Sequence, residues 1–376
     1  MVVTGSQNVT RILLIGGGHT HVVALRRLAS MKPAGLDIHL VSPEPSTSYS
    51  GLLPGHIAGH WPRTDLEIPL APLCHPSGTT LHTTRAISLD PSARIAGLDD
   101  GRELAFEYAS LDIGAIAAVD APDGLVSVGV PVKPLGPFAD QWSAFVSSVE
   151  AGANPPCAAV IGAGTAGVEL ALSMKHRLDK LDLTARPKVA LIERGEVLLP
   201  DGNASMRRQL EKELNRACVT VYKGEPVVDA DETLMRLASG EGVPARFVAL
   251  ATGARPQSWL AGTGLALNDG FVSVGPTLQS ISHPHIFACG DTAHLTFSPR
   301  PKAGVFAVRQ GAVLAEQIGR LAANRALSEY HPQTDYLKLV SLGRRRAIAE
   351  KWGVSLNLPG MWSLKRHIDF DFMKDN

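Results

Sequence analysis

The chain has 376 residues, of which 45% are hydrophobic and 19% are charged. This length predicts two domains with a smaller additional piece, and the composition excludes a disordered chain. The formal net charge is zero, so the sequence gives no electrostatic indication of a nucleic-acid partner. Residues 1–10 lack the charged and apolar regions of a signal peptide, and a cytoplasmic protein is therefore expected.

The first predicted unit is a strand, a glycine loop, a helix and a second strand. Within "ILLIGGGHTH", Gly16 and Gly18 fill the first two slots of the dinucleotide-binding pattern G-x-G-x-x-G. His21 stands in the third slot, which mainly governs how closely the helix packs on the strand, so we expect a wider loop that keeps its phosphate contacts. The second strand ends at Ser42 instead of an acidic residue, and Glu44 follows two positions later. By itself, this unit leaves a dinucleotide site and a simple turn as alternatives.

The following segments are irregular at first and then contain short strands. Residues 46–60 are rich in Ser, Gly and Pro, which predicts a loop with a short helix. Residues 78–112 predict short antiparallel strands joined by turns at "DPSA" and "DDGRE". The sequence "PVKPLG" at residues 131–136 is typical of a linker that crosses to another domain.

A second strand, loop and helix begin near residue 157, and here the glycine pattern is complete. Gly162, Gly164 and Gly167 permit the tight turn, the approach of a pyrophosphate and the close packing of the helix. Glu193 ends the next strand, where a carboxylate can accept hydrogen bonds from a ribose hydroxyl. The strand, the helix and the acid agree, which favours a nucleotide site over a plain turn.

Two later strands also end in polar or glycine residues. "FVALATGARP" closes on Gly253, and "HIFACGDTA" ends at Gly290 and Asp291. A carboxylate at the second position can bind a sugar-alcohol chain such as ribitol, which strengthens the first loop as a dinucleotide site. The four cysteines form no C-x-x-C pair and have no zinc-binding spacing, so we expect neither a disulfide nor a metal site.

The C-terminal region combines a basic run at residues 343–346 with the stretch "GMWSLKRHIDFDFM". Helical spacing places apolar side chains near one face and charged ones elsewhere; the apolar set is Met361, Leu364, Ile368 and Phe372, and the charged set is Lys365, Arg366 and Asp369. This pattern is typical of a helix packed on the folded chain or at a dimer interface, with a helix resting on a membrane surface as the alternative. The stretch is too short and too charged to span a bilayer.

The two loops, the "ATG" at residues 251–253 and the "HIFACGD" at residues 285–291 resemble the pyridine nucleotide-disulfide oxidoreductase superfamily. Within it, the chain resembles the branch of type II NADH dehydrogenases and sulfide:quinone reductases. The stretches "GGGHTHV", "YSGLLPGHIAGH", "PVKP" and "RPKAGVFAVRQG" are similar to a narrower group, the flavoproteins fused to or encoded beside selenide, water dikinase. In that group histidine is the normal occupant of the third glycine slot, and the loop binds FAD.

The resemblance implies a role for each matching position. The FAD pyrophosphate would be bound by Gly16, Gly18 and His19. The adenosine ribose would be bound by Ser42 or Glu44, and the adenine would lie beside Ala86. The ribitol would be bound by Gly290 and Asp291, and the flavin ring would lie beside Lys302, Ala303, Gly304 and Val305. NAD(P)H would be bound by Gly162, Gly164, Thr165, Gly167 and Glu193, with Gly253 in the "ATG" turn. Glu169, near the nicotinamide, and Lys302, near the flavin, are the catalytic candidates.

Differences between this sequence and the motifs of its relatives reduce the number of reactions that the chain is expected to catalyse. Disulfide reductases need a cysteine pair close to the flavin, and sulfide:quinone reductases use a cysteine within the second nucleotide region, but this chain has neither. Sulfide oxidation is therefore disfavoured. Type II NADH dehydrogenases carry two glutamines in A-Q-x-A-x-Q-x-G, and here Val305 and Arg309 take those places. A quinone acceptor stays open on this ground.

The sequence thus predicts an α/β fold with two Rossmann-like domains. The FAD domain is expected over residues 1–125 and 262–329, the inserted NAD(P)H domain over 126–261, and a small C-terminal region over 330–376. The expected activity is hydride transfer from NADH or NADPH to FAD, and then direct electron transfer to an acceptor such as a quinone. The alternative is a flavin-binding redox sensor or partner protein linked to selenium metabolism with little turnover. A homodimer and a peripheral position at the inner face of the cell membrane stay open.

Overall fold

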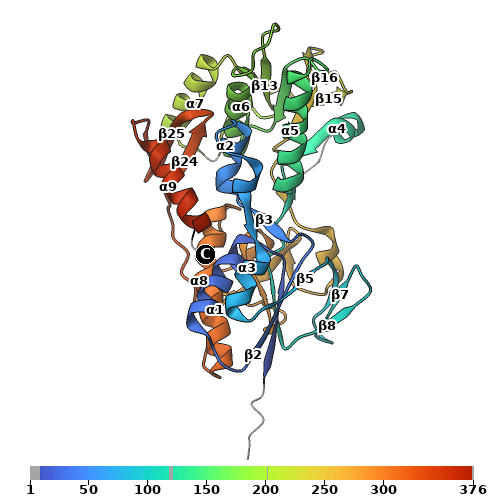
Figure 1. Ribbon diagram of the computed structural model, residues 1–376, viewed down its shortest axis with the longest axis vertical. Coiled ribbons are helices and arrows are strands. Elements are labelled where there is room, and N and C mark those ends of the chain that lie inside the picture. Colours follow the sequence, from blue (N-terminus) through green and yellow to red (C-terminus); the bar gives the residue numbers. More distant parts are fainter. Residues whose placement is uncertain (1–8, 118–121, 201, 375–376) are drawn as a thin grey trace, which may run out of the picture.

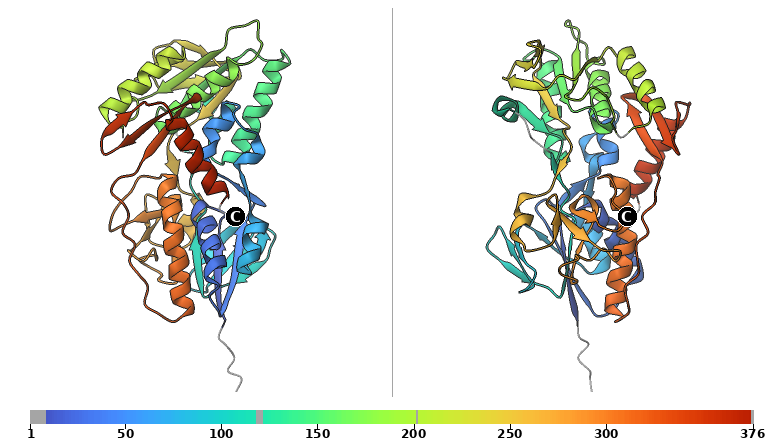
Figure 2. Two further views of the ribbon diagram at one scale, coloured as in Figure 1. Left: turned by 60° about the vertical axis from the view of Figure 1, so that its left-hand side comes forward. Right: turned by 180° about the vertical axis from the view of Figure 1, so that it is seen from behind.

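The computed structural model describes residues 9–117, 122–200 and 202–374. Figure 1 shows an elongated molecule with two lobes, one above the other. The lower lobe holds helices α1 (His19–Met31), α3 (Leu70–Cys74) and α8 (Gly304–Ala322). The upper lobe holds α4 (Asp123–Val128), α5 (Leu135–Glu150), α6 (Thr165–Leu178) and α7 (Ala204–Arg216). The red C-terminal elements lie along one side of the upper lobe, and the last helix reaches down to the junction of the two lobes, as the two turned views in Figure 2 confirm.

The lower lobe is built on a five-stranded parallel sheet of order β22-β9-β1-β2-β5. Its strands come from distant parts of the chain; they are β1 (Thr10–Ile15), β2 (Leu36–Ser42), β5 (Thr80–Thr83), β9 (Tyr108–Leu111) and β22 (Ile286–Ala288). The run from Ile12 to Ile15 is almost completely buried, as expected for a strand covered on both faces. Helix α8 packs closely on α1 because a Cβ on Gly311 would lie only 2.4 Å from the Cβ of Val23.

The upper lobe repeats this arrangement with a sheet of order β11-β18-β12-β13-β14, also parallel throughout. The strands are β11 (Gly129–Pro131), β12 (Cys157–Ile161), β13 (Lys188–Glu193), β14 (Thr220–Lys223) and β18 (Phe247–Leu250). The prediction of an α/β fold with two Rossmann-like units is confirmed.

Among the smaller sheets of the described residues, three are antiparallel and have three strands each. They consist of β6 (Ala86–Asp90), β7 (Ile95–Leu98) and β8 (Glu103–Ala105); β15 (Val227–Ala230), β16 (Leu234–Leu237) and β17 (Gly242–Pro244); and β24 (Lys338–Leu342), β25 (Arg344–Lys351) and β26 (Val354–Leu356). The prediction of antiparallel strands over residues 78–112 is right for β6, β7 and β8 but wrong for β5 and β9. These two pair in parallel in the first sheet because β2 and β1 extend beside them.

Segments from both ends of the chain enter the core of the upper lobe. Helix α2 (Leu53–Ile57) packs on α5 and α6, and Leu52 and Ile57 are fully buried there. On the other side, Val340 and Ile348 of the β24–β25 hairpin belong to the same apolar cluster. The upper lobe is therefore stabilised by residues that lie far outside the central part of the sequence.

The C-terminal helix α9 (Met361–Lys374) forms as predicted, but it buries a different face. Leu364 and Ile368 are 37% and 44% exposed, whereas Asp369 is buried and Lys365 is nearly so. Of the two alternatives, packing of the apolar face on the folded chain is wrong for these residues, because the helix instead buries Lys365 beside its partner Asp369. Among the described residues, no helix has the length and the apolar character required to cross a bilayer.

Candidate functional site

The first glycine loop presents free backbone donors at the start of α1. Gly16 has φ +98, and a Cβ there would lie 2.3 Å from the carbonyl oxygen of Asp112, so only glycine fits. The amide groups of Gly17, Gly18 and His19 donate to no protein acceptor in the described part of the chain. Unpaired amides at a helix N-terminus are the donors that a pyrophosphate requires.

His21 explains how the loop works without a third glycine. Its side chain is fully buried; Nδ1 lies 2.6 Å from the carbonyl oxygen of Gly16, and Nε2 lies 2.8 Å from Oγ of Ser110. Burial lowers the pKa of His21, so the ring is neutral. Nδ1–H then donates to the Gly16 carbonyl, and the Ser110 hydroxyl donates to Nε2. The imidazole thus connects the loop to strand β9 from within the helix.

Asp112, at the end of β9, caps the same helix. Its Oδ2 accepts hydrogen bonds from the amides of Thr20 at 2.8 Å and His21 at 3.2 Å. A Cβ on Gly18 would lie 2.3 Å from this carboxylate, so the second glycine of the loop makes room for Asp112. The carboxylate takes the inner amides and leaves the outer ones at Gly17, Gly18 and His19 for a ligand.

The second glycine loop is open at the position where a phosphate would lie. Gly162 has φ +97, and a Cβ on Gly167 would lie 1.8 Å from the Gly162 carbonyl oxygen, so both positions require glycine. A Cβ on Gly164 would meet nothing within 4 Å. Glu193 bends back to this loop and accepts hydrogen bonds from the amides of Ala163 at 2.8 Å and Gly195 at 2.9 Å.

Asp291 lies in a cluster of positive charge below the first loop. Its carboxylate forms an ion pair with Lys133 at 2.5 Å, and the neighbouring amide of Gly290 donates to Oε1 of Gln310 at 2.6 Å. Lys302 donates to the carbonyl of Ala293 and lies 3.9 Å from the ring centre of Phe271. Burial lowers the pKa of Lys302 to about 8, against the opposing effect of Asp291.

His19 joins the first loop to the side of the molecule where α9 lies. Its ring contacts Tyr49 and Phe372 edge-on, at centroid distances of 5.3 Å and 5.8 Å. Nε2 lies 3.3 Å from the carbonyl oxygen of Ser48, and burial lowers the pKa of His19. A Cβ on Gly304 would lie 3.9 Å from Nδ1, which places this nitrogen next to the start of α8.

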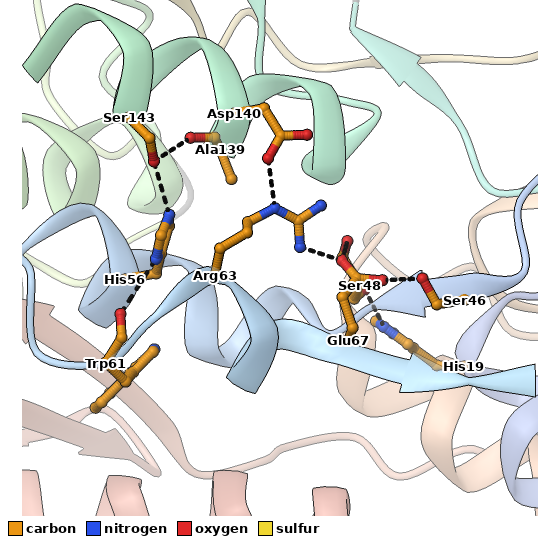
Figure 3. A network of polar contacts seen from close by, with 10 residues as sticks. All are labelled: His19, Ser46, Ser48, His56, Trp61, Arg63, Glu67, Ala139, Asp140 and Ser143. Atoms are coloured by element: carbon orange, nitrogen blue, oxygen red, sulfur yellow. Dashed lines mark hydrogen bonds and ion pairs between the residues drawn. The ribbon is translucent and has the colours of Figure 1, made fainter. Parts of the chain in front are cut away.

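A polar chain continues from His19 to the upper lobe, as Figure 3 shows. Glu67 accepts hydrogen bonds from Ser46 and Ser48 and pairs with Arg63. Arg63 reaches Oδ1 of Asp140 on α5 at 2.9 Å. Burial opposes ionisation of Glu67, but these donors together lower its pKa. The chain fixes the segment around residue 48 against both lobes.

A second buried polar group lies between α6 and α9. Lys365 donates to Oδ2 of Asp369 at 2.9 Å and to the carbonyl of Gly51 at 3.1 Å, and the Tyr49 hydroxyl donates to Oδ1 of Asp369 at 3.3 Å. Glu169 accepts a hydrogen bond from the amide of Ser341 at 2.6 Å. Burial raises the pKa of Glu169. Burial acts to lower the pKa of Lys365, but Glu169 and Asp369 raise it overall.

The other predicted positions are distributed around the two loops. Ser42 is buried at the end of β2, with Oγ 3.2 Å from a Cβ placed on Gly17, whereas Glu44 is exposed. Ala86 begins β6, and Gly253 has φ +82 with open space beside it. Thr165 begins α6, and Ala303 caps α8, which starts with Gly304 and Val305. Their roles in binding remain predictions.

The sequence motifs assign no role to Lys133, Asp112 or Gln310, although two of these residues lie in stretches that carry the family resemblance. Lys133 belongs to "PVKP" and Gln310 to "RPKAGVFAVRQG", whereas Asp112 stands at the end of the region over residues 78–112 in which short strands are predicted. A charged residue within an otherwise apolar strand end was the available signal for Asp112. No local pattern indicates that Lys133 pairs with Asp291, because 158 residues separate them.

The cysteines take no part in these clusters as a pair. All four are free; Cys74, Cys157 and Cys289 are buried and Cys218 is exposed. Burial raises the pKa of Cys289 well above its usual range, so it stays a thiol. No group of three His, Cys, Asp or Glu side chains in the described ranges is arranged to hold a metal ion.

Comparison with known proteins agrees with this fold. The demethylphylloquinone reductase NdbB of Synechocystis is 23% identical over 87% of this chain and 77% of its own. The sulfide:quinone oxidoreductase of Aquifex aeolicus superposes with a TM-score of 0.82 at 18% identity, covering 98% of this chain and 92% of that one. NDH2 of Plasmodium falciparum, solved with NADH, also gives 0.82, at 13% identity over 98% and 97%.

The extent of these matches differs. Among the curated relatives, the matched part is between 24% and 77% of the relative's length, and in the first of them it is about half. The family model described as pyridine nucleotide-disulphide oxidoreductase matches residues 10–311, which is most of the chain and includes both glycine loops and Asp291. The chain therefore belongs to the pyridine nucleotide-disulphide oxidoreductase family.

Proposed function

We propose that this protein is an FAD-dependent NADH dehydrogenase that delivers electrons directly to a quinone. FAD, when bound, accepts a hydride from the nicotinamide and releases two electrons to the second substrate. The single observation that carries the proposal is the pair of glycine loops with unpaired amides, one in each lobe. Each loop has the amide donors that a dinucleotide pyrophosphate needs, and the second loop also has open space at Gly164.

The lower lobe is the proposed FAD domain. The amides of Gly17, Gly18 and His19 would hold the pyrophosphate, and Asp291 would bind the ribitol chain. Lys133 and Lys302 bring two positive charges to the same place. Beside a bound flavin, these charges would stabilise the negative charge that the ring gains on reduction, and so would favour acceptance of the hydride.

The upper lobe is the proposed NADH domain, with the boundaries near residues 126 and 261. Gly164 and Thr165 would contact the pyrophosphate, and the Glu193 carboxylate would accept hydrogen bonds from the adenosine ribose. A phosphate on that ribose would meet the same negative charge, so NADH is the proposed coenzyme. Glu193 already accepts two backbone amides, which orients its carboxylate toward the loop.

A cysteine relay is excluded from the proposed route, since the buried thiol of Cys289 has no cysteine partner among the described residues. Reduction of a quinone to the quinol consumes two electrons and two protons. One of these protons arrives with the hydride of NADH, and the buried group of Glu169, Lys365, Asp369 and Tyr49 is the proposed source of the other on the side of α9. Lys365 is the proposed donor because it is the cationic member, and solvent then reprotonates it.

The quinone is apolar, and its proposed entry is along α9. Leu364 and Ile368 on the outer face of this helix are exposed, and we propose that they rest on the membrane surface that holds the quinone. The peripheral position at the inner face of the cell membrane belongs to this proposal. A homodimer through the same face is the alternative use of these side chains.

Anaerobic stopped-flow mixing tests the proposal. NADH should bleach the flavin absorbance of the purified yellow protein within the time of a turnover, and a soluble ubiquinone analogue should restore it. The control is a Gly164→Val variant, which fills the open space at the second loop and should abolish bleaching by NADH but not by dithionite. A flavin that stays oxidised in NADH would contradict the proposal and favour a redox sensor.

A further inference from the structure

A basic hollow lies at the far end of α6 from its glycine loop. Its volume is about 640 Å³, and it is lined by His60, His176, Asp179, Lys180, Arg344 and Arg345. These residues come from three elements: the turn after α2, the C-terminal end of α6 and the start of β25. Helix α6 has 14 residues, so about 20 Å separates this hollow from the coenzyme phosphates proposed at Thr165.

The positive charges in this hollow are not neutralised within the protein. Lys180, Arg344 and Arg345 form no ion pair with a carboxylate in the described part of the chain, and Arg345 only covers the ring of Trp362. Asp179, the one carboxylate of the lining, is paired with Lys175. Three unpaired cations in one concave surface create a positive potential that attracts an anion.

The two histidines of the lining, His60 and His176, lie within this positive potential. Their ring centres are 5.3 Å apart. The pKa of His176 is lowered to about 4, mainly by burial and further by His60, Lys180 and Arg344. A bound anion would remove part of this repulsion.

The hollow is also held in a fixed shape. Nε2–H of His60 donates to the carbonyl of Gly343 at 2.9 Å. Gly343 has φ +73, and a Cβ there would lie 2.1 Å from the carbonyl oxygen of Leu172, so the hairpin turn is pressed against α6. Arg344 and Arg345 follow directly from this turn. Their backbone is therefore positioned before any ligand arrives.

A second hollow of about 430 Å³ shares His60 with the first one. Its lining includes the apolar side chains of Trp61, Trp142 and Val146 beside the charged Glu150 and Arg177. Trp61 stacks on Trp362 at a centroid distance of 6.3 Å, so two indoles lie beside the basic hollow. Together the two hollows offer a site for a charged group next to a site for an apolar or aromatic one.

We infer that this pair of hollows binds an organic phosphate, with its phosphate between Arg344, Arg345 and Lys180 and its remainder beside Trp61. Arginine forks and a lysine are the side chains that recognise phosphate oxygens. The phosphate belongs either to a free small molecule or to the headgroup of an anionic phospholipid. This site is independent of the proposed redox function, because neither dinucleotide loop contributes to it.

NMR titration of the histidine ring protons in the FAD-loaded protein tests the inference. The probes are inorganic phosphate, phenyl phosphate and vesicles of phosphatidylglycerol, with phosphatidylcholine vesicles as the reference. We expect the His176 signal to shift and its pKa to rise with at least one phosphate probe. Tighter binding of phenyl phosphate than of inorganic phosphate would identify a free organic phosphate, and binding to phosphatidylglycerol alone would identify a lipid.

The double variant Arg344→Gln/Arg345→Gln should weaken this binding at least tenfold. Arg236 and Arg325 are exposed arginines away from the hollow, and Arg236→Gln/Arg325→Gln removes the same charge. This matched control should bind like the wild type. The inference is overturned by wild-type protein that responds to none of the phosphate probes, or by equal weakening in the two double variants.

Discussion

The imidazole of His21 lies 2.6 Å from the carbonyl oxygen of Gly16, five residues earlier in the same loop. The other ring nitrogen binds Ser110 on the neighbouring strand. The side chain in the third glycine slot therefore links the loop to the sheet through two hydrogen bonds. It does so from a buried position in which a neutral ring can satisfy both partners.

Replacement of His21 by alanine should destabilise the fold and the loop together. The change leaves the Gly16 carbonyl and the Ser110 hydroxyl without partners and opens a cavity, so we expect a loss of about 2–4 kcal/mol in the free energy of unfolding. FAD should also dissociate faster. Urea unfolding and flavin release measure the two effects, and Ser110→Ala, which removes one hydrogen bond, is the milder control. Unchanged stability and flavin content in His21→Ala would contradict the role of His21 in linking the loop to the sheet.

The stability of the protein should fall as the pH drops below the ordinary histidine value of 6.5. The folded-state pKa values of His19 and His21 are lowered by burial, so the unfolded chain binds more protons in this range. Their contribution is present above pH 6.5 and is lost on acidification. Unfolding midpoints measured between pH 7 and 5 should decline less steeply in His21→Ala than in the wild type. Parallel curves would show that His21 is not the group that titrates.

Glu193→Gln should shift the coenzyme preference from NADH toward NADPH. The substitution removes the negative charge that repels a ribose phosphate and weakens one charged hydrogen bond, an effect of roughly tenfold on the ratio of the two rates. Flavin reduction by each coenzyme is the measurement. Glu196→Gln, three residues along, removes the same charge from an exposed position and should leave the ratio unchanged. A wild-type preference for NADPH would reverse the assignment.

The sequence predicts features that depend on residues close together in the chain, and it does not predict those that depend on residues far apart. Each glycine loop and the two strands that flank it are encoded within about 40 residues, so the pattern at Gly162–Gly167 and the acid at Glu193 could be found by inspection. Asp112 and Lys133 depend on strands and linkers that meet only in the folded chain. The face of α9 that is buried depends on partners that lie 320 residues away at Tyr49. Such relationships leave no periodic signal.

Titration of Lys302 should make the free energy of unfolding depend on pH from about pH 8 upward. Its pKa is lowered to about 8, so the folded protein releases this proton before the unfolded chain, whose value is near 10.5. The free energy of unfolding should therefore rise between pH 8 and 10.5, and Lys302→Met should remove that rise. In activity assays, the loss of the positive charge beside the flavin site should slow flavin reduction above pH 8 in the wild type only. The exposed Lys188→Met variant is the control.

Lys365→Met should separate the two half-reactions. If Lys365 supplies protons to the quinone, reoxidation of the flavin should slow by roughly a hundredfold, while reduction by NADH keeps its rate. Removal of the cation also leaves Asp369 and Glu169 buried without their partner, which costs about 3–5 kcal/mol. The double variant Lys365→Met/Asp369→Asn should regain stability but not reoxidation. A double variant that reoxidises normally would assign Lys365 a structural role only.

The exposed side chains of α9 should decide membrane contact without unfolding the helix. Leu364→Glu/Ile368→Glu places two charges on the outer face, where the wild-type residues are 37% and 44% exposed, so the unfolding midpoint should stay unchanged. Cosedimentation with phosphatidylglycerol vesicles should be lost, because the helix would have to bury charge in the lipid. The control is Ile87→Glu/Val228→Glu, at residues that are 51% and 48% exposed elsewhere.

Truncation after Leu358 should behave differently, since it also removes Lys365 from Gly51 and Phe372 from Tyr49, and it should lower the thermal stability. Vesicle binding that is absent in the wild type, or equal in all variants, would leave α9 as a packing element of the two lobes.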